Sequence, residues 1–265
     1  MPKRTAISAL FLDFDGTISP VDVSREKAQP TPMARKLLQE IAETIPVAVI
    51  TTKDMHFIKE RVPFVSAWAA IGGVEVTIGD RTLTLPHAIK FSPIVESVLR
   101  LIEAEMRKIG KGICIERKAL SDGRVVAFCA DWRQAEDWNS VGRRIYAILK
   151  PFRERDLVIR TYDGCPYLDV YPEGVSKGRA FLILKEGLKV DGSIMYLGDS
   201  ELDNPAFELA EISIGVIHDE TSPELDSQFF VLFDDVEGLF HELLENQLVF
   251  NLESRWIVRN ERRTK

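Results

Sequence analysis

Phe11-Leu12-Asp13-Phe14-Asp15-Gly16-Thr17 is the most informative segment of this 265-residue chain, because an apolar run there ends directly in two carboxylates and a glycine. Residues 6–12 form a nearly continuous apolar run of strand length. Such a run is typical of a strand that is buried on both faces of a parallel sheet. Gly16 lets the chain turn sharply after the strand. We therefore expect Asp13 and Asp15 at the edge of a buried sheet.

Strands and helices alternate on both sides of this segment. An apolar run at 45–50 follows a helical segment at 31–44, whose Pro32 suits the first turn of a helix. Strand, helix and strand in this order are typical of a βαβ unit. The alternation resumes near Lys177, with predicted helices at 177–186, 205–210 and 235–245 and predicted strands at 193–197, 212–216 and 229–233. The sequence thus predicts an α/β domain with a Rossmann-like, doubly wound parallel sheet.

The middle of the chain has a different pattern. Residues 74–85 alternate apolar and polar side chains around Gly79-Asp80, which predicts a β-hairpin. A helix is predicted next, with Ser92 as its N-cap and Pro93 at its first position. Strands are then predicted at 112–116, 124–130, 157–160 and 167–171, and a second helix at 134–149. These elements predict an α+β domain at 87–171, inserted into a core domain that comprises 1–86 and 172–265.

Composition and charge exclude several classes of protein. The chain has 45% hydrophobic and 28% charged residues, as an ordinary globular protein does, and no apolar stretch reaches the roughly 18 residues of a membrane-spanning helix. A net charge of −7 argues against a nucleic-acid partner. Three cysteines without C-x-x-C spacing suggest neither disulfides nor a structural zinc site. We expect a cytoplasmic protein without nucleic-acid or membrane partners. The sequence does not determine the oligomeric state, and a monomer is compatible with it.

A second acid pair occupies a corresponding position later in the chain. The predicted strand at 193–197 is followed by Gly198-Asp199-Ser200-Glu201-Leu202-Asp203. Ligands of an open parallel sheet bind outside the carboxyl ends of its strands, so Asp13 and Asp199 are expected at one edge. Mg²⁺ takes about six oxygen ligands and is usually held by one or two carboxylates. This pattern predicts a site for magnesium and phosphate.

The other groups that phosphoryl transfer requires lie at the same kind of junction. Asp13 could accept a phosphoryl group, and Asp15 could protonate the leaving alcohol and then deprotonate water. Thr51 ends the second strand and Lys177 opens a helix, where both would orient phosphoryl oxygens. Each group alone has an ordinary structural explanation, as a turn aspartate, a helix-terminal acid, an N-cap or a surface lysine. Their conjunction in chain order favours phosphoryl transfer.

Four ordered segments carry a resemblance to a known family: Phe11-Leu12-Asp13-Phe14-Asp15-Gly16-Thr17, Val49-Ile50-Thr51-Thr52, Gly174-Val175-Ser176-Lys177-Gly178 and Leu197-Gly198-Asp199-Ser200-Glu201-Leu202-Asp203. They resemble the four motifs of the haloacid dehalogenase superfamily and frame nearly the whole chain. The resemblance implies a phosphatase with an inserted α+β cap and a Mg²⁺ cofactor. The implied roles are Asp13 as nucleophile, Asp15 as general acid and base, Thr51 and Lys177 as phosphate-stabilising groups, Thr52 as a substrate contact, and Asp13, the Asp15 carbonyl, Asp199 and Asp203 around the metal.

Segments of the insert resemble the trehalose-6-phosphate phosphatase branch of this superfamily. They are Ile115-Glu116-Arg117-Lys118-Ala119-Leu120-Ser121, Ala130-Asp131-Trp132-Arg133 and the stretch 168–178. The resemblance implies that the substrate's sugar hydroxyls contact four charged residues, Glu116, Lys118, Arg133 and Asp169. Charged side chains can hold hydroxyls through strong hydrogen bonds.

Two segments depart from that branch. Ile71-Gly72-Gly73 stands where the branch typically has Glu-His-Gly, and 198–205 is closer to the corresponding motif of mannosyl-phosphoglycerate and sucrose phosphatases. The leading prediction is a hydrolase of trehalose biosynthesis that cleaves trehalose 6-phosphate through an aspartyl-phosphate with Mg²⁺. The alternatives are a phosphatase of mannosyl- or glucosyl-3-phosphoglycerate or of sucrose phosphate, a phosphomutase, and a sugar-phosphate sensor without turnover.

Overall fold

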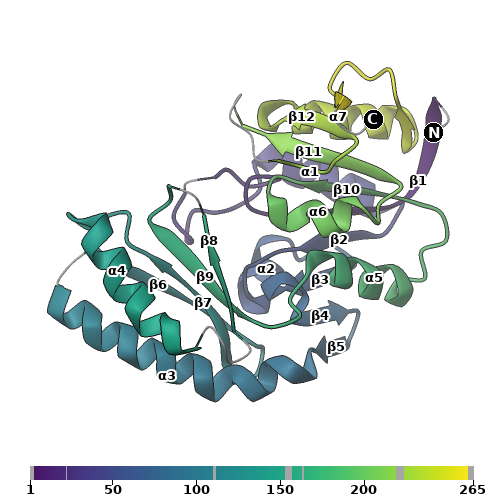
Figure 1. Ribbon diagram of the computed structural model, residues 1–265. Helices are drawn as coiled ribbons and strands as arrows, with labels where there is room; N and C mark the ends of the chain where they lie inside the picture. Colours follow the sequence, from purple (N-terminus) through teal and green to yellow (C-terminus); the bar gives the residue numbers. More distant parts are fainter. Residues whose placement is uncertain are drawn as a thin grey trace. The chain divides into compact units, whose positions relative to one another are not determined.

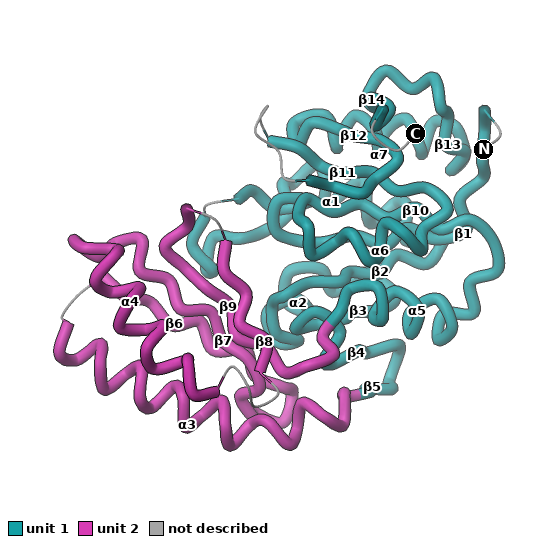
Figure 2. The backbone as a smooth tube through the Cα atoms, in the orientation of Figure 1, with its two compact units in different colours: residues 1–83, 176–265 teal, residues 84–175 magenta. Residues whose placement is uncertain are grey.

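The computed structural model describes residues 3–21, 23–109, 112–152, 157–162, 164–218 and 224–261. The chain divides into two compact units, and Figure 2 shows them in different colours. Unit 1 consists of Met1–Leu83 and Ser176–Lys265, and unit 2 consists of Thr84–Val175. The unit boundaries lie within a few residues of 86/87 and 171/172, the positions expected from the sequence.

Unit 1 is built on a mainly parallel sheet with strand order β14-β12-β11-β10-β1-β2-β3-β4-β5 (Figure 1). β1 (Arg4–Leu12) pairs in parallel with β10 (Ser193–Gly198) on one side and with β2 (Val47–Ile50) on the other. Its second half is fully buried, which explains the unbroken apolar run. The remaining strands are β3 (Ala67–Ala70), β4 (Glu75–Ile78), β5 (Arg81–Thr84), β11 (Ile212–Ile217), β12 (Phe229–Leu232), β13 (Val249–Asn251) and β14 (Val258–Arg259).

Helices cover both faces of this sheet (Figure 1). On one face, Phe181 of α5 and Phe207 of α6 join the buried side chains of β1 and β10. On the other face α1 packs against α7. Pro32 lies in the first turn of α1, as expected from the sequence, and Thr31 caps this helix. The helices of unit 1 are α1 (Pro32–Ala42), α2 (Met55–Arg61), α5 (Lys177–Gly187), α6 (Asn204–Phe207) and α7 (Val236–Glu245), with 3-10 turns at η1 (Ile71–Gly73), η3 (Glu201–Asp203) and η4 (Phe233–Asp235). The doubly wound α/β prediction is therefore confirmed.

Unit 2 is an antiparallel sheet with two helices on one face. The strand order is β6-β7-β9-β8, and α3 and α4 pack on the sheet through an apolar cluster that includes Val95, Phe128, Ile145 and Val170. The elements are α3 (Pro86–Ile109), β6 (Cys114–Ala119), β7 (Val125–Asp131), α4 (Trp138–Leu149), η2 (Lys150–Phe152), β8 (Leu157–Thr161) and β9 (Tyr167–Pro172). Because side chains alternate along each strand, Glu116, Lys118 and Asp169 lie on the face away from this cluster, which is called the polar face below.

Two predicted helix starts in unit 2 are wrong. α3 begins at Pro86, and Pro93 lies inside it without ending it. A proline removes one backbone donor, but the buried stripe of this helix extends to both sides of Pro93 and compensates for that loss. α4 begins at Trp138, where Asp137 caps it by accepting a hydrogen bond from the Ser140 backbone N–H.

The tail after Asn246, whose role the sequence leaves open, belongs to unit 1. β13 pairs with β1, and β14 pairs with β12, both in antiparallel orientation. Trp256 packs so closely against Gly238 of α7 that a side chain at this glycine would overlap the indole ring. Within the described residues, every helix is too short or too polar to cross a bilayer.

Candidate active site

The predicted catalytic residues of unit 1 lie at the carboxyl ends of three adjacent parallel strands. Asp13 follows β1, Thr51 follows β2, and Asp199 follows β10. Lys177 is the first residue of α5, a helix that packs against the same sheet. β1 lies between β10 and β2, so the strand order continues in opposite directions on its two sides. Ligands of open parallel sheets bind at the carboxyl ends of the strands beside such a switch in order. Residues far apart in the sequence therefore meet at this edge.

Lys177 is the centre of the buried charge cluster. Its Nζ lies 2.8 Å from Oδ2 of Asp13 and 2.7 Å from Oδ1 of Asp203. The three side chains are nearly or completely buried. A buried ammonium is stable only when it is paired and hydrogen-bonded, and the two carboxylates meet that requirement. The alternative explanation of Lys177 as a surface lysine is thereby excluded.

Asp203 accepts hydrogen bonds on both of its oxygens. Oδ1 accepts from Lys177 and from the hydroxyl of Tyr196. Oδ2 accepts from the backbone N–H of Ser200 at 3.1 Å and from its hydroxyl at 2.9 Å. A carboxylate has about four acceptor positions, so these four donors use its capacity. The orientation of this side chain is therefore fixed from both sides.

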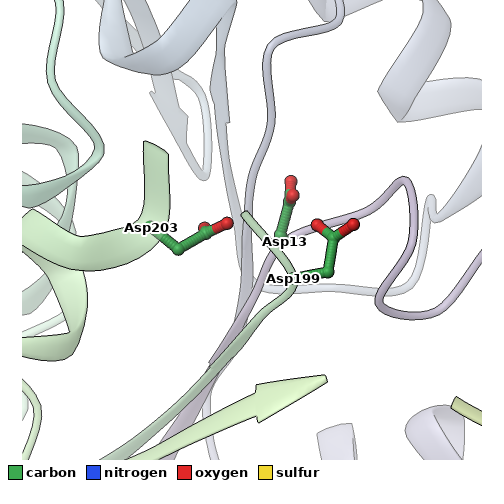
Figure 3. Close-up of side chains that lie close together, drawn as sticks. All are labelled: Asp13, Asp199 and Asp203. Atoms are coloured by element: carbon green, nitrogen blue, oxygen red, sulfur yellow. The ribbon is translucent and has the colours of Figure 1, made fainter. Parts of the chain in front are cut away.

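Three carboxylates come together at this edge. Asp13, Asp199 and Asp203 each offer an oxygen, and these oxygens all lie within 4.8 Å of one another. Figure 3 shows Asp13 and Asp199 side by side, with Asp203 approaching from a neighbouring helical segment. This donor set consists of hard oxygen ligands, which Mg²⁺ prefers. The cluster fits a divalent cation of that kind.

The electrostatics of the cluster also fit a cation. Burial raises the pKa of Asp13 to about 7, with Asp203 and Asp15 adding to the rise and Lys177 opposing it. Burial and the charges of Asp13 and Asp203 raise the pKa of Asp199 well above its ordinary value. Burial lowers the pKa of Lys177, but the two carboxylates outweigh this effect and raise it. Three carboxylates share one ammonium, and a divalent cation would supply the missing positive charge.

Two glycines make room for these carboxylates. Gly16 has a φ of +72°, and a Cβ atom there would overlap the carboxylate of Asp199. A Cβ atom on Gly198 would overlap the carboxylate of Asp203. Glycine is thus required at both positions by the close approach of a side chain, and at Gly16 also by a left-handed backbone.

Asp15 and Thr51 lie beside the cluster in different surroundings. The carboxylate of Asp15 is more exposed than that of Asp13, and its Oδ2 lies 3.6 Å from Nζ of Lys53. Thr51 is fully buried, and its Oγ1 accepts a hydrogen bond from the Lys53 backbone N–H at 3.2 Å. Thr52, the adjacent predicted substrate contact, is half-buried. The loop after β2 therefore presents one buried hydroxyl and one cation.

The backbone of Ile71-Gly72-Gly73 forms hydrogen bonds with the loop that follows β2. The N–H of Ile71 donates to the Lys53 carbonyl and the N–H of Gly72 donates to the Thr51 carbonyl, both at 2.8 Å. All three residues have positive φ, which the two glycines tolerate at little cost. The segment that departs from the trehalose-phosphatase pattern thus positions Thr51 with backbone atoms alone.

In unit 2, Lys118 and Asp169 form a buried ion pair on the polar face of the sheet. Lys118 donates to Oδ1 of Asp169 at 2.9 Å and to the hydroxyl of Tyr171 at 2.7 Å. The hydroxyl of Tyr162 donates to Oδ2 of Asp169 at 2.8 Å. These groups hold the pKa of Asp169 below its ordinary value although burial acts in the opposite direction. Two of the predicted sugar contacts are thus brought together.

Of the other two predicted sugar contacts, Glu116 shares the polar face with this pair, and Arg133 lies beyond the end of β7. Glu116 of β6 lies opposite Cys129 of β7, and Cys129 lies opposite Asp169 of β9. Directly paired residues of an antiparallel sheet point to the same face, so Glu116 belongs to the polar face. Arg133 follows the end of β7 and forms an ion pair with Asp131 at 2.9 Å.

Several contacts of the site were missed by sequence reasoning. Tyr196 lies in an apolar strand and has no motif of its own, whereas Ser200-Glu201-Leu202-Asp203 has the pattern of a capping box, which could have pointed to Ser200. Lys53 follows the second motif directly, which could have singled it out. His218 follows β11, and its Nε2 lies 2.9 Å from the carbonyl of Gly16. The pairing of β10 with β1 and β11 brings Tyr196 and His218 to the cluster.

Comparisons with known sequences identify relatives of one kind. The chain matches the family model named trehalose-phosphatase over residues 11–223. It is 28% identical over 236 residues to the trehalose-phosphate phosphatase of Mycobacterium ulcerans (strain Agy99), which covers 84% of this chain and 57% of the relative. It is 24% identical over 209 residues to the probable trehalose-phosphate phosphatase 4 of Oryza sativa subsp. japonica, covering 76% of this chain and 54% of the relative. The chain thus spans little more than half the length of these curated relatives.

Solved structures share the fold at low sequence identity. The C-terminal domain of the C. albicans trehalose-6-phosphate phosphatase superposes with a TM-score of 0.72 at 18% identity, covering 91% of this chain and 93% of that one. A trehalose-6-phosphate phosphatase related protein gives 0.70 at 20% identity, covering 91% and 99%. A haloacid dehalogenase-like hydrolase from Bacteroides thetaiotaomicron gives 0.62 at 13% identity, covering 89% and 99%. The predicted fold class, an α/β core with an α+β insert, is thereby confirmed.

Proposed function

Because the chain belongs to the trehalose-phosphatase family, we propose that it is a Mg²⁺-dependent phosphomonoesterase that hydrolyses trehalose 6-phosphate. Such an activity would place it in trehalose biosynthesis. The observation that supports this proposal most directly is the pairing of Lys177 with Asp13 and Asp203 beside Asp199. It combines a candidate nucleophile, a fixed cation and a set of metal ligands at one sheet edge.

In the first step, a carboxylate oxygen of Asp13 attacks the phosphorus of the substrate. A bond from that oxygen to phosphorus forms, and the bond from phosphorus to the sugar oxygen breaks. Asp15 donates its proton to the leaving sugar oxygen, which departs as the free alcohol. Lys177 and the hydroxyl of Thr51 stabilise the negative charge of the transferring group. Both side chains are buried, and electrostatic stabilisation is stronger where water is excluded.

In the second step, Asp15 is the base. It takes a proton from a water molecule whose oxygen attacks the phosphorus of the aspartyl-phosphate. The bond between Asp13 and phosphorus breaks, so inorganic phosphate leaves and the Asp13 carboxylate is restored. The partly exposed position of Asp15, beside Lys53, suits a group that must exchange protons with sugar and water.

Asp13 and Asp199 would hold Mg²⁺, together with the backbone carbonyl of Asp15. The metal would neutralise the phosphoryl oxygens and offset the negative charge of the cluster. Asp203 lies within the same group of oxygens, but its four hydrogen bonds favour a role in holding Lys177 over direct ligation.

The polar face of unit 2 would supply sugar contacts. Glu116, Lys118 and Asp169 belong to this face, and the ion pair between the last two is held by Tyr162 and Tyr171. A hydroxyl of the substrate would meet charged acceptors and donors that are already oriented. Arg133, beyond the end of β7, is a further proposed contact. Location in the cytoplasm and the lack of nucleic-acid and membrane partners stay predictions.

The experiment that tests the function is phosphate release from a panel of esters, each with Mg²⁺ and with EDTA. The panel contains trehalose 6-phosphate, sucrose 6-phosphate, mannosyl- and glucosyl-3-phosphoglycerate and p-nitrophenyl phosphate, with the Asp13→Asn variant as the inactive control. We expect metal-dependent release to be fastest from trehalose 6-phosphate. Faster release from another sugar phosphate would change the substrate. Transfer between two sugar positions would indicate a mutase, and binding without release would indicate a sensor.

A further inference from the structure

We propose that Tyr196 is a positioning residue, which keeps the Lys177 ammonium in place for phosphoryl transfer by orienting Asp203. The inference deepens the proposed function and rests on it. Tyr196 lies in the middle of β10, three residues before Asp199. Its side chain is completely buried, and its hydroxyl hydrogen-bonds to Oδ1 of Asp203.

The ring of Tyr196 is fixed by its packing. Phe181 of α5 and Phe207 of α6 contact it edge to face, with ring centroids 6.2 and 5.5 Å away. The hydroxyl therefore projects from a rigid aromatic cluster of the core. A donor held in this way offers its hydrogen bond in one direction only, which is what a positioning group requires.

The hydrogen bonds form a continuous chain from this core to the nucleophile. Tyr196 and Lys177 both donate to Oδ1 of Asp203, and Lys177 also contacts Asp13. Ser200 holds the opposite oxygen, Oδ2. Without the phenol, one of the two donors on Oδ1 is lost and the carboxylate can rotate toward Lys177. The ammonium would then follow Asp203 and lose its alignment with the transferring phosphoryl group.

Packing alone does not account for a tyrosine at this position. The ring lies in an otherwise aromatic and aliphatic cluster, where phenylalanine would fill nearly the same volume. Burying a hydroxyl is unfavourable unless it is hydrogen-bonded, and the net gain from such a bond is only about 1 kcal/mol. The distinctive consequence of the hydroxyl is its contact with the acid that holds Lys177.

The test compares Tyr196→Phe with a matched control, Ile194→Val, which removes one buried methyl group from the same strand and core cluster and leaves the tyrosine hydroxyl and its two aromatic neighbours in place. We expect Tyr196→Phe to lower kcat about tenfold and to leave KM within about twofold, because small misplacements of a catalytic group impair the chemical step. Its Tm should stay within about 5 °C of the wild type, as expected for one hydrogen bond. Ile194→Val should lower Tm slightly but leave kcat within about twofold.

A second readout does not depend on turnover. Orthovanadate can mimic the five-coordinate transferring group, and its affinity in the presence of Mg²⁺ is measured by calorimetry. We expect Tyr196→Phe to weaken orthovanadate binding about tenfold, while inorganic phosphate binds within about twofold of the wild-type affinity, because only the transition-state mimic requires exact alignment. Ile194→Val should leave both affinities unchanged.

The outcomes separate this proposal from the proposed function. If the wild type releases phosphate but Tyr196→Phe equals it in kcat and in orthovanadate affinity, the positioning role is wrong and the function stands. If Ile194→Val loses as much kcat, or if Tyr196→Phe fails to fold, the hydroxyl serves the fold and the proposal is overturned. If no ester is hydrolysed, the function fails, and orthovanadate affinity alone decides: weaker binding by Tyr196→Phe supports positioning, and equal binding refutes it.

Discussion

Nζ of Lys177 lies 2.8 Å from Oδ2 of Asp13, although the whole of unit 2 separates the two residues in the sequence. Both side chains are buried, and the ammonium stabilises the buried Asp13 carboxylate, while Asp203 holds the ammonium from its other side. The pair joins the end of β1 to the start of α5 and fixes the candidate nucleophile against a cation. The predictions below follow from this arrangement and from the ion pair of unit 2.

Replacing Asp13 by Asn should abolish phosphate release. The amide cannot form the acyl phosphate, and loss of a covalent nucleophile lowers turnover by more than about 10⁴-fold. Lys177 keeps its contact with Asp203, so we expect the variant to fold and to show a normal melting transition. Glu201→Gln, which changes an exposed acid of the same edge, serves as the control and should keep full activity. Measurable turnover by Asp13→Asn would exclude it as the nucleophile.

Replacing Asp15 by Asn should affect the two steps differently. General acid and base groups contribute about 10²- to 10⁴-fold, and sugar phosphates need both functions. p-Nitrophenol leaves without a proton, so this ester should still phosphorylate the enzyme. Rapid mixing should then show a burst of no more than one equivalent of p-nitrophenol, followed by slow turnover. The lack of a burst together with an equal loss on all esters would contradict the role of Asp15.

Binding of Mg²⁺ should stabilise the protein. A ligand at 100 times its Kd adds about 2.7 kcal/mol to the free energy of unfolding. We expect Tm to rise with Mg²⁺ and to return after EDTA, and Asp199→Asn to lose most of this rise. Glu201→Gln should retain it, because its side chain is exposed and lies outside the group of converging oxygens. An equal rise in both variants would place the metal elsewhere.

The ion pair of Lys118 and Asp169 should make unit 2 sensitive to acid. Burial raises the pKa of Asp169, but Lys118 and the hydrogen bonds outweigh it, so the folded pKa lies below the unfolded value of 3.8. The stabilisation is complete above that value and is lost as the pH falls through the folded pKa. Asp169→Asn should lower the free energy of unfolding by about 3 kcal/mol at neutral pH, because it leaves the buried Lys118 unpaired.

Thermal melts of both proteins between about pH 3 and pH 7 measure this dependence. As the pH falls, the Tm of the wild type should decrease more than the Tm of Asp169→Asn. The difference in Tm between the two proteins should therefore become smaller. Asp80→Asn, at an exposed turn, is the control and should follow the wild type. A constant difference between wild type and Asp169→Asn would show that the pKa of this carboxyl is unshifted.

The three cysteines should differ in reactivity. Cys114 and Cys165 are exposed, whereas burial and the charge of Asp169 raise the pKa of Cys129 to about 12. The thiolate is the reactive form, so Cys129 should resist modification at pH 8. In a titration with a chromogenic disulfide, two thiols should react rapidly in the native protein and three after unfolding. Cys129→Ala should leave the native count at two, and three fast thiols would contradict the structure.

The sequence by itself determined the fold class and most of the site in unit 1. Unbroken apolar runs identify buried parallel strands, and acids directly after those runs must lie at the carboxyl edge of the sheet, because strand direction fixes that edge. Asp13 and Asp199 were therefore predictable from local pattern alone. Helix starts were less predictable. Pro93 has the local features of a first helical position, but buried residues on both sides of it stabilise a helix that continues past this proline.

Tertiary structure alone decided how these groups are connected. The sequence predicts only that Tyr196 lies in a buried strand. Its contact with Asp203 exists only because α5, α6 and β10 pack together. The resemblance singles out Lys118 as a sugar contact, but its burial and its ion pair with Asp169 depend on the pairing of β7 with β9. The physical reason is that hydrogen bonds and ion pairs act over a few ångströms in space. A sequence specifies which groups reach a sheet edge, but only the folded register and packing specify which of them touch.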